Sequence, residues 1–166
     1  MPLMTWSNEL SVGLPDIDRE HHWLLDATNL LHDELSKPQP SPAVVGDTLH
    51  GLMDYTVNHF VGEESLFQQV QYPHADAHRA LHDRFTAQVM GLINDHEAGK
   101  DIGTNTLELL KNWLIQHIMV ADKAYVPFIL AAESAANRAR AGRRPGLKRP
   151  RAWADKRGKQ RARHQG

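Results

Sequence analysis

The chain contains no cysteine among its 166 residues, which excludes a disulfide scaffold, a thiolate zinc site and cysteine-ligated iron–sulfur clusters. It has no apolar run approaching about eighteen residues, so the sequence predicts no membrane span. The first residues, MPLMTWSNEL, lack the basic-then-apolar order of a secretory signal, and we therefore expect a cytoplasmic protein. The length suits about one domain with a sizeable core.

The formal net charge of −1 hides an uneven distribution of charge along the chain. Residues 1–132 carry 7 Lys and Arg against 18 Asp and Glu, a balance of −11. Residues 133–166 carry 12 Lys and Arg against 2 Asp and Glu, a balance of +10. Of the 11 histidines, ten lie in the acidic part. The sequence thus joins an acidic, histidine-rich body to a basic tail.

Apolar residues recur at helical spacing in four stretches, and no strand-like alternation competes with them. The stretches cover about 18–37, 43–70, 75–99 and a last one that begins at 104, with Thr104 as the expected N-cap. Proline-rich and glycine-containing segments separate them. The end of the fourth stretch is open, because Pro127 should kink or stop a helix that the following residues otherwise extend.

This pattern predicts an all-α fold, an up-down-up-down four-helix bundle in residues 1–136. A sparse apolar arm with Trp6, Val12, Leu14 and Ile17 precedes the first helix, and we expect it to pack on the bundle. Residues 137–166 are rich in Arg, Gly and Pro and have no periodicity, so they are predicted to form a disordered basic tail.

Seven polar residues fall on helix faces that the periodicity predicts to be buried. His21, for example, precedes Leu24 and Leu25 by three and four residues, on the apolar face of its helix. His117 and Asp122 are five residues apart, about 140° around an α-helix, so each is expected to reach inward from one flank of the apolar face. The seven residues are His21, His59, Glu63, His78, His82, His117 and Asp122.

The positions of these seven residues along their helices also predict that they lie at the same level of the bundle. In an up-down-up-down bundle, the starts of helices one and three lie beside the ends of helices two and four, so all seven converge toward one end. Buried carboxylates without partners cost several kcal/mol each, and a metal ion would supply the compensating charge. The other histidines of the body have no such grouping and are expected at the surface, in loops or in ordinary core positions: His22, His32, His50, His74 and His96.

The ligand types narrow the choice of metal without fixing it. Zinc usually takes four ligands and would leave this set over-supplied. Imidazole suits iron, copper and nickel alike. If two six-coordinate irons shared the site, five imidazoles, two bridging carboxylates and a bridging oxide or hydroxide would leave one position open, which suits a small ligand such as O2.

Over about residues 6–128 the sequence resembles the hemerythrins, most closely the bacterial single-domain type. The resemblance rests on Trp6, Asp18-Arg-Glu-His21, His59-Phe-Val-Gly-Glu63-Glu64, Tyr72-Pro73 with His78 and His82, and Trp113-Leu-Ile-Gln-His117 with Asp122. Glu20 stands where bacterial relatives often carry Gln, which adds negative charge near the site. The basic tail has no counterpart in the family pattern.

The resemblance implies a non-haem, oxo- or hydroxo-bridged di-iron centre that binds O2. It implies that His78, His82 and His117 hold the filled iron, that His21 and His59 hold the open one, and that Glu63 and Asp122 bridge them. Flanking residues would form a dry pocket around the centre, although plain core packing explains them equally well: Phe60, Trp113, Leu114 and Ile118.

Reversible O2 binding, as a carrier, a store or a supplier to an O2-using enzyme, is the leading functional prediction, and the protein is not expected to be an enzyme. The alternatives are an O2 or redox sensor, and a peroxidase-like or iron-handling activity. For the tail 137–166, the alternatives are a solvated extension that contacts an acidic body, a nucleic-acid-binding segment, and contact with an anionic membrane or an acidic partner.

Overall fold

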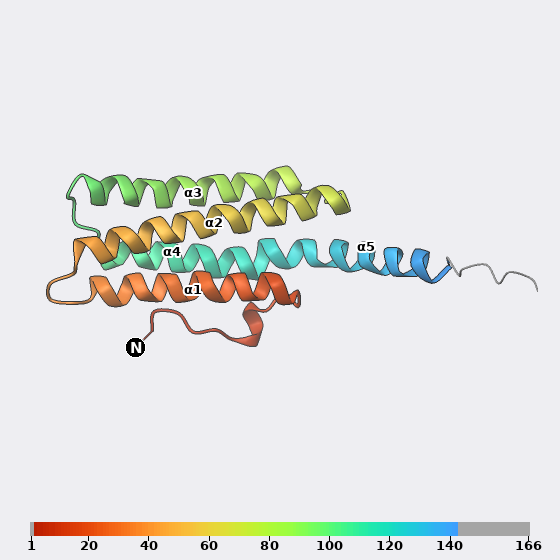
Figure 1. The fold of residues 1–166 in the computed structure, drawn as a ribbon, viewed down its shortest axis with the longest axis horizontal. Coiled ribbons are helices and arrows are strands. Elements are labelled where there is room, and N and C mark those ends of the chain that lie inside the picture. The colour runs from red at the N-terminus through yellow and green to blue at the C-terminus, as the bar shows by residue number, and fades with distance from the viewer. Residues whose placement is uncertain (1, 143–166) are drawn as a thin grey trace, which may run out of the picture.

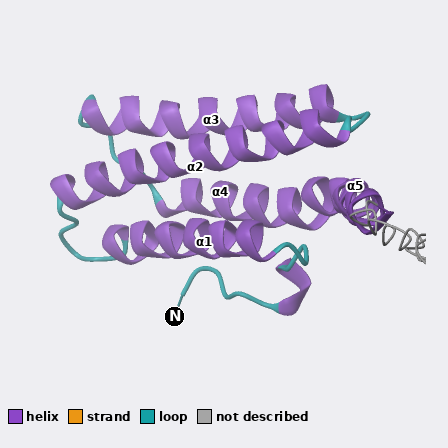
Figure 2. Ribbon diagram, turned by 45° about the vertical axis from the view of Figure 1, so that its right-hand side comes forward, coloured by secondary structure: helices purple, strands orange, loops and turns teal. Residues whose placement is uncertain are grey.

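A computed structural model describes residues 2–142, and in this part the chain is helical and contains no strand (Figures 1 and 2). The predicted up-down-up-down four-helix bundle is confirmed. Its rods are α1 (Pro15–Leu35), α2 (Pro42–Val70), α3 (Ala75–Glu97) and a long rod made of α4 (Thr104–Gln116), η2 (His117–Asp122) and α5 (Lys123–Gly142). The predicted tail beyond residue 142 lies outside the described residues.

The ends of the helices follow from residues that cannot continue one. Pro15 and Pro42 stand at helix starts, where the missing N–H costs nothing. The side chain of Ser41 caps α2 by accepting a hydrogen bond from the Val44 N–H at 3.4 Å. Gln71 ends α2 in the left-handed conformation with φ of 53°.

The N-terminal arm packs on the bundle, as the sequence predicted. Met4 and Val12 are buried, and a short 3₁₀ helix, η1 (Asn8–Leu10), lies between them. The Met4 N–H donates to Asn29 Oδ1 at 2.8 Å, and the Val12 N–H donates to Asp18 Oδ1 at 2.7 Å. Both bonds tie the arm to α1.

The fourth rod does not stop at Pro127, which settles the helix end that the sequence left open. The rod changes its winding just before the proline: η2 is a π-helix, and the Lys123 N–H bonds to the Ile118 carbonyl five residues back. Pro127 follows one turn later, and α5 continues to Gly142. The first six residues assigned to the basic tail, 137–142, are therefore helical.

Two apolar clusters fill the interior, and the seven polar residues lie between them. The larger cluster includes Phe60 of α2 and Ile118 of η2. The smaller one contains Phe67, Tyr72, Tyr125 and Ile129. Glu63 lies between Phe60 and Phe67 along α2, so the polar site is enclosed by apolar side chains on both sides.

The long rod Leu107–Gly142 is the one helix of the described chain that is long and apolar enough to cross a membrane, although polar residues interrupt its apolar sequence. Core helices of helical bundles have the same length and composition. Leu107, Leu110 and Leu114 of this rod are all buried in the main core of the bundle. These three side chains therefore already face protein, whereas Leu109 and Val120 of the same rod are exposed.

Candidate metal centre

The structure brings all seven sequence-predicted site residues together inside the bundle. Each is at most 5% exposed, although all of them are polar or ionisable. They come from all four rods, as the positions along the helices predicted. The bundle therefore encloses one polar cluster made of His21, His59, Glu63, His78, His82, His117 and Asp122.

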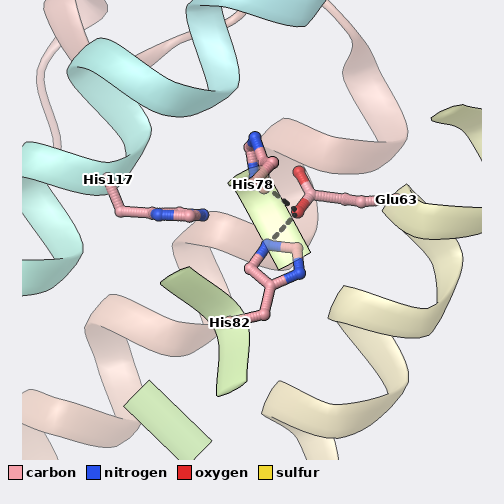
Figure 3. A group of neighbouring side chains, drawn as sticks. All are labelled: Glu63, His78, His82 and His117. Carbon is pink, nitrogen blue, oxygen red and sulfur yellow. Dashed lines mark ion pairs between the residues drawn. The ribbon is translucent and has the colours of Figure 1, made fainter. Parts of the chain in front are cut away.

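The cluster divides into two groups of ligand atoms that share one carboxylate. In each group the candidate atoms lie within 4.8 Å of one another. Figure 3 shows the first group, in which Glu63 points its carboxylate toward the imidazoles of His78 and His82, and His117 approaches from α4–η2. The second group contains His21, His59 and the same Glu63. One side therefore offers three imidazoles and the other side two.

Asp122 also faces both groups, through different oxygens. Its Oδ1 lies 3.2 Å from His78 Nε2 and 3.1 Å from His117 Nε2. Its Oδ2 lies 3.1 Å from His21 Nε2. A carboxylate in this position can hold one cation with each oxygen, which is the arrangement of a bridging ligand.

Glu63 makes its approaches through a single oxygen. Glu63 Oε2 lies 3.1 Å from His82 Nε2 and 3.7 Å from His59 Nε2. The other oxygen, Oε1, accepts a hydrogen bond from the hydroxyl of Tyr125 at 2.5 Å. Tyr125 thus fixes the orientation of the shared carboxylate and directs Oε2 toward both groups of imidazoles.

The π-helical winding of η2 places His117 and Asp122 on one face of the rod. The sequence prediction assumed α-helical winding and set the two residues on opposite flanks, about 140° apart. In a π-helix the hydrogen bonds join residues five apart, so two such residues lie about one turn from each other and point to nearly the same side. The result is the 3.1 Å approach of His117 Nε2 to Asp122 Oδ1. The sequence signal for this winding was the five-residue spacing of His117 and Asp122, since both were expected to reach the interior.

The buried polar atoms that lack hydrogen-bond partners are concentrated at this site. Among the side chains of residues 2–103 and 107–142, all such atoms except Thr56 Oγ1 belong to the seven residues. They include the Nε2 atoms of His78 and His82 and both oxygens of Asp122. Folded proteins pair most buried polar groups, and each unpaired one costs about 1–3 kcal/mol. Imidazole nitrogens and carboxylate oxygens are metal ligands, so this donor set fits a pair of metal ions.

Charged residues outside the cluster hold two of the imidazoles by their other nitrogen. Glu20 Oε2 lies 2.7 Å from His59 Nδ1. Glu64 Oε1 lies 3.1 Å from His82 Nδ1, and Arg79 Nε donates to Glu64 Oε2 at 2.9 Å. Carboxylates in this position keep the proton on Nδ1 and leave the Nε2 lone pair free for a metal. The sequence flagged Glu20 only for its charge and gave Glu64 and Arg79 no role.

The pKa values at the site favour the forms that bind metals. Burial tends to raise the pKa of Asp122, but the facing imidazoles of His117, His21 and His78 bring that pKa well below its ordinary value. Burial lowers the pKa of His117. These directions keep the carboxylate ionised and the His117 imidazole neutral near neutral pH.

His59 behaves differently from this pattern, and the nearby phenol of Tyr125 is also shifted. Burial acts to lower the pKa of His59, but the hydrogen bond to Glu20 and the negative charges of Glu63, Asp122 and Glu20 together outweigh it, and the pKa of His59 is raised. Burial, followed by the charge of Glu63, raises the pKa of the Tyr125 phenol. Tyr125 therefore remains a hydrogen-bond donor throughout the ordinary pH range. The sequence missed Tyr125, although it lies three residues after Asp122 and thus near the same face of the rod.

Aromatic side chains cover the imidazoles, as the expected dry pocket requires. Phe60 stacks on His82 with ring centroids 3.7 Å apart, and Trp113 stacks on His117 at 4.3 Å. Leu114 and Ile118 are buried in the adjoining core. A cavity of about 440 Å³, lined by Leu81, Asn112, Trp113, Gln116, His117, Val120 and Ala121, brings open space to the edge of His117.

The five other histidines of the body take no part in the cluster. His22 stacks on Trp6, and His96 Nε2 lies 2.9 Å from the Pro42 carbonyl oxygen. None of the five is buried: His22, His32, His50, His74 and His96. They are surface or partly exposed residues, as predicted.

The family model of the hemerythrin HHE cation binding domain matches residues 12–129. The chain therefore belongs to the hemerythrin family. It is 32% identical over 131 residues to a bacteriohemerythrin of Stenotrophomonas maltophilia, covering 79% of this chain and 84% of that one.

A bacteriohemerythrin of Methylococcus capsulatus is 33% identical over 133 residues, covering 79% of this chain and all of that protein. A crystal structure of wild-type hemerythrin superimposes with a TM-score of 0.71 and 32% identity, over 76% of this chain and 98% of that one.

Proposed function

We propose that this protein binds O2 reversibly at a pair of non-haem irons held by the seven clustered residues. The observation that carries the proposal is the nitrogen-rich donor set, in which five buried imidazoles face two shared carboxylates. Four-helix di-iron oxidases and ferritin-like proteins build their sites mainly from glutamates instead. Membership of the hemerythrin family supports iron over copper or nickel.

The roles of the residues follow the division of the cluster. His78, His82 and His117 would hold one iron, and His21 and His59 the other, with Glu63 and Asp122 between them. When bound, such an iron pair supplies two electrons and an open coordination position for O2. Because His21 and His59 form the smaller histidine set, we assign the open position to their side.

Surrounding residues would keep the site dry and its ligands aligned. Phe60 and Trp113 stack on the imidazoles of His82 and His117 and would limit the contact of their ring faces with water. Tyr125 holds the Glu63 carboxylate through its hydroxyl. A dry, fixed ligand set favours reversible binding over loss of electrons to solvent, so we assign a carrier, storage or delivery role in the cytoplasm. An O2-using enzyme would then be the recipient.

Metal analysis together with optical spectroscopy tests this proposal. We expect two irons per chain and a spectrum that changes on exposure to O2 and returns on its removal over repeated cycles. Replacing His82 with Ala should lower the iron content, whereas the matched His50→Ala change at an exposed position should not.

A single zinc per chain, or no metal, would refute the di-iron site. Irreversible oxidation with rapid turnover of peroxide would instead favour a catalytic role. A spectrum that follows the redox state of a partner, without reversible O2 binding, would favour a sensor.

A further inference from the structure

We propose that the groove between α1 and α2 is a docking site for a second copy of this chain, and that the projecting end of α5, residues 130–142, is the segment of that copy which fills it. The proposal concerns the outer surface of the bundle and does not depend on the metal centre or on the metal being iron. Three observations support it: the shape and lining of the groove, the pattern of the projecting helix, and the charges that flank each of them.

The groove is a largely apolar depression of about 420 Å³. Its exposed rims include Trp23 and Leu30 of α1 and Val44 of α2, which are 38%, 56% and 38% exposed. Between the rims lie small, half-buried residues, among them Ala27 and Gly51. A Cβ atom added at Gly51 would meet nothing within 4 Å. Such a groove can admit a further helix at close range, because the distance between packed helices depends on the size of the side chains at the contact.

The projecting end of α5 has an alanine face that the described part of the bundle leaves largely uncovered. Ile129 is the last buried residue of α5, and no residue from 130 to 142 is buried. This part of the helix continues past the ends of the other helices (Figure 1). Its alanines recur at the spacing i, i+3, i+4 and i+7, which places four of them on one face: Ala132, Ala135, Ala136 and Ala139. Most helical stability in proteins comes from the packing of such a face, so the segment is suited to a partner surface.

The charges that flank the two surfaces are opposite. Asp26 of α1 and Asp47 of α2 line the groove, and both are exposed. On the projecting helix, the exposed Arg138 and Arg140 lie about 100° to either side of Ala139. None of these four charged side chains forms an ion pair within the described part of the chain. A helix seated with its alanines in the groove would therefore direct one arginine toward α1 and the other toward α2, where each meets a carboxylate.

The positions of the two surfaces favour docking between copies over docking within one chain. Figure 1 shows that α5 projects from the end of the bundle opposite the loop between α1 and α2. Val44 and Asp47 lie in the first two turns of α2, beside that loop. The end of α5 therefore points away from the groove of its own chain. Contact between two different surfaces of identical chains is head-to-tail and builds open chains or closed rings.

The contact is expected to be reversible and dependent on protein concentration. Thirteen helical residues at about 1.5 Å each span roughly 20 Å. Three to four turns of helix bury less area than the roughly 1,200–2,000 Å² of a stable interface. The charged pairs at the rims add little affinity but select the partner and the register, so reversing them is the sharpest test.

The test measures the average mass of the full-length, metal-loaded protein by sedimentation over a range of concentrations. Three double variants are compared with wild type, and their metal content and helicity serve as folding controls. The helix variant reverses the arginines, the groove variant reverses the aspartates, and the control variant repeats the charge change of the helix variant at exposed positions outside both surfaces: Arg138→Glu with Arg140→Glu, Asp26→Lys with Asp47→Lys, and Arg84→Glu with Lys100→Glu.

We expect the average mass of wild type and of the control variant to rise alike with concentration. The helix variant and the groove variant, each alone, should associate more than about tenfold more weakly, because like charges then face each other. An equal mixture of the two should regain the association of wild type, because the glutamates of one variant meet the lysines of the other.

A change of shape without a change of charge gives a second test. Gly51→Phe fills the groove, whereas Gly91→Phe places the same side chain at an exposed glycine of α3 that also has open space around it. We expect only Gly51→Phe to weaken association. Three results would overturn the proposal: a single-chain mass for wild type at every concentration, no recovery in the mixture, or equal association of the two glycine variants, which would indicate contact through charge alone.

Discussion

Replacing Tyr125 with Phe should destabilise the metal-free protein through one lost hydrogen bond. The Tyr125 side chain is fully buried, and its hydroxyl donates to Glu63 Oε1 at 2.5 Å. Phenylalanine keeps the ring contacts with Phe67 and His78 and removes only the donor. Hydrogen bonds to charged groups are worth about 1.5–3 kcal/mol, so we expect the free energy of unfolding to fall by about 2 kcal/mol.

Denaturant unfolding with a chelator present measures this change, with the metal kept out of both states. The slope of the free energy against denaturant should stay the same, since the substitution exposes no new surface. Tyr72→Phe is the matched control, because Tyr72 packs in the same aromatic cluster and its hydroxyl makes no hydrogen bond with the described side chains of residues 2–103 and 107–142. It should cost less than about 0.5 kcal/mol.

Metal binding gives a second measurement on the same variant. Tyr125 orients Glu63, and loss of a residue that orients a ligand costs about 10–100-fold in metal affinity. We therefore expect Tyr125→Phe to bind the same number of metal ions more weakly than wild type, in competition with a chelator. Equal unfolding free energies for Tyr125→Phe and Tyr72→Phe, together with unchanged metal affinity, would refute a positioning role for Tyr125.

Three further predictions follow from the same contacts. Removing the metal should lower the melting temperature, because a ligand at 100 times its Kd stabilises the native state by about 2.7 kcal/mol; equal melting curves with and without chelator would contradict this. Glu20→Ala should weaken metal binding about 10–100-fold, because it removes the hydrogen-bond acceptor of His59 Nδ1. Glu20→Gln should weaken it less, because its amide oxygen can still accept the hydrogen bond from Nδ1. Competition titration measures both affinities, and equal losses would show that the contact does not act through hydrogen bonding. At the other end of the bundle, the Lys37 ammonium and then the Ser41 N–H lower the pKa of Glu34 from its ordinary value of 4.5. The stability from this contact is complete above that value and is lost as the pH falls through it toward the lowered native pKa. Unfolding free energy should therefore drop more steeply below about pH 5 in wild type than in Glu34→Gln, while Glu133→Gln, at an exposed position, should follow wild type.

The apolar periodicity predicted the helices and their buried positions, but it could not predict contacts between side chains of neighbouring helices. The four rods and the inward positions of residues such as His21 and Glu63 follow from apolar spacing, because a helix buries one face. Helix starts were less accurate: α1 begins at Pro15, three residues before the predicted start, because a proline at the first turn needs no N–H partner. Glu64 and Arg79 meet only when α2 and α3 pack together, so spacing along either helix could not reveal the pair.

In the long rod, the π-helical segment η2 between α4 and α5 determines both the path of the helix and the positions of the site residues. With α-helical winding, His117 and Asp122 would diverge by about 140°, and at least one would leave the cluster. Asp122 is fully buried and faces imidazoles with both oxygens, so displacing it would leave those groups and its own charge without compensation. The wider turn costs regular hydrogen bonding over six residues but keeps both side chains inside. It also sets the phase of the helix that follows, and three residues later Tyr125 reaches Glu63 from that helix. One local change of winding thus places His117, the Asp122 carboxylate that faces both groups of imidazoles, and the phenol that holds the Glu63 carboxylate.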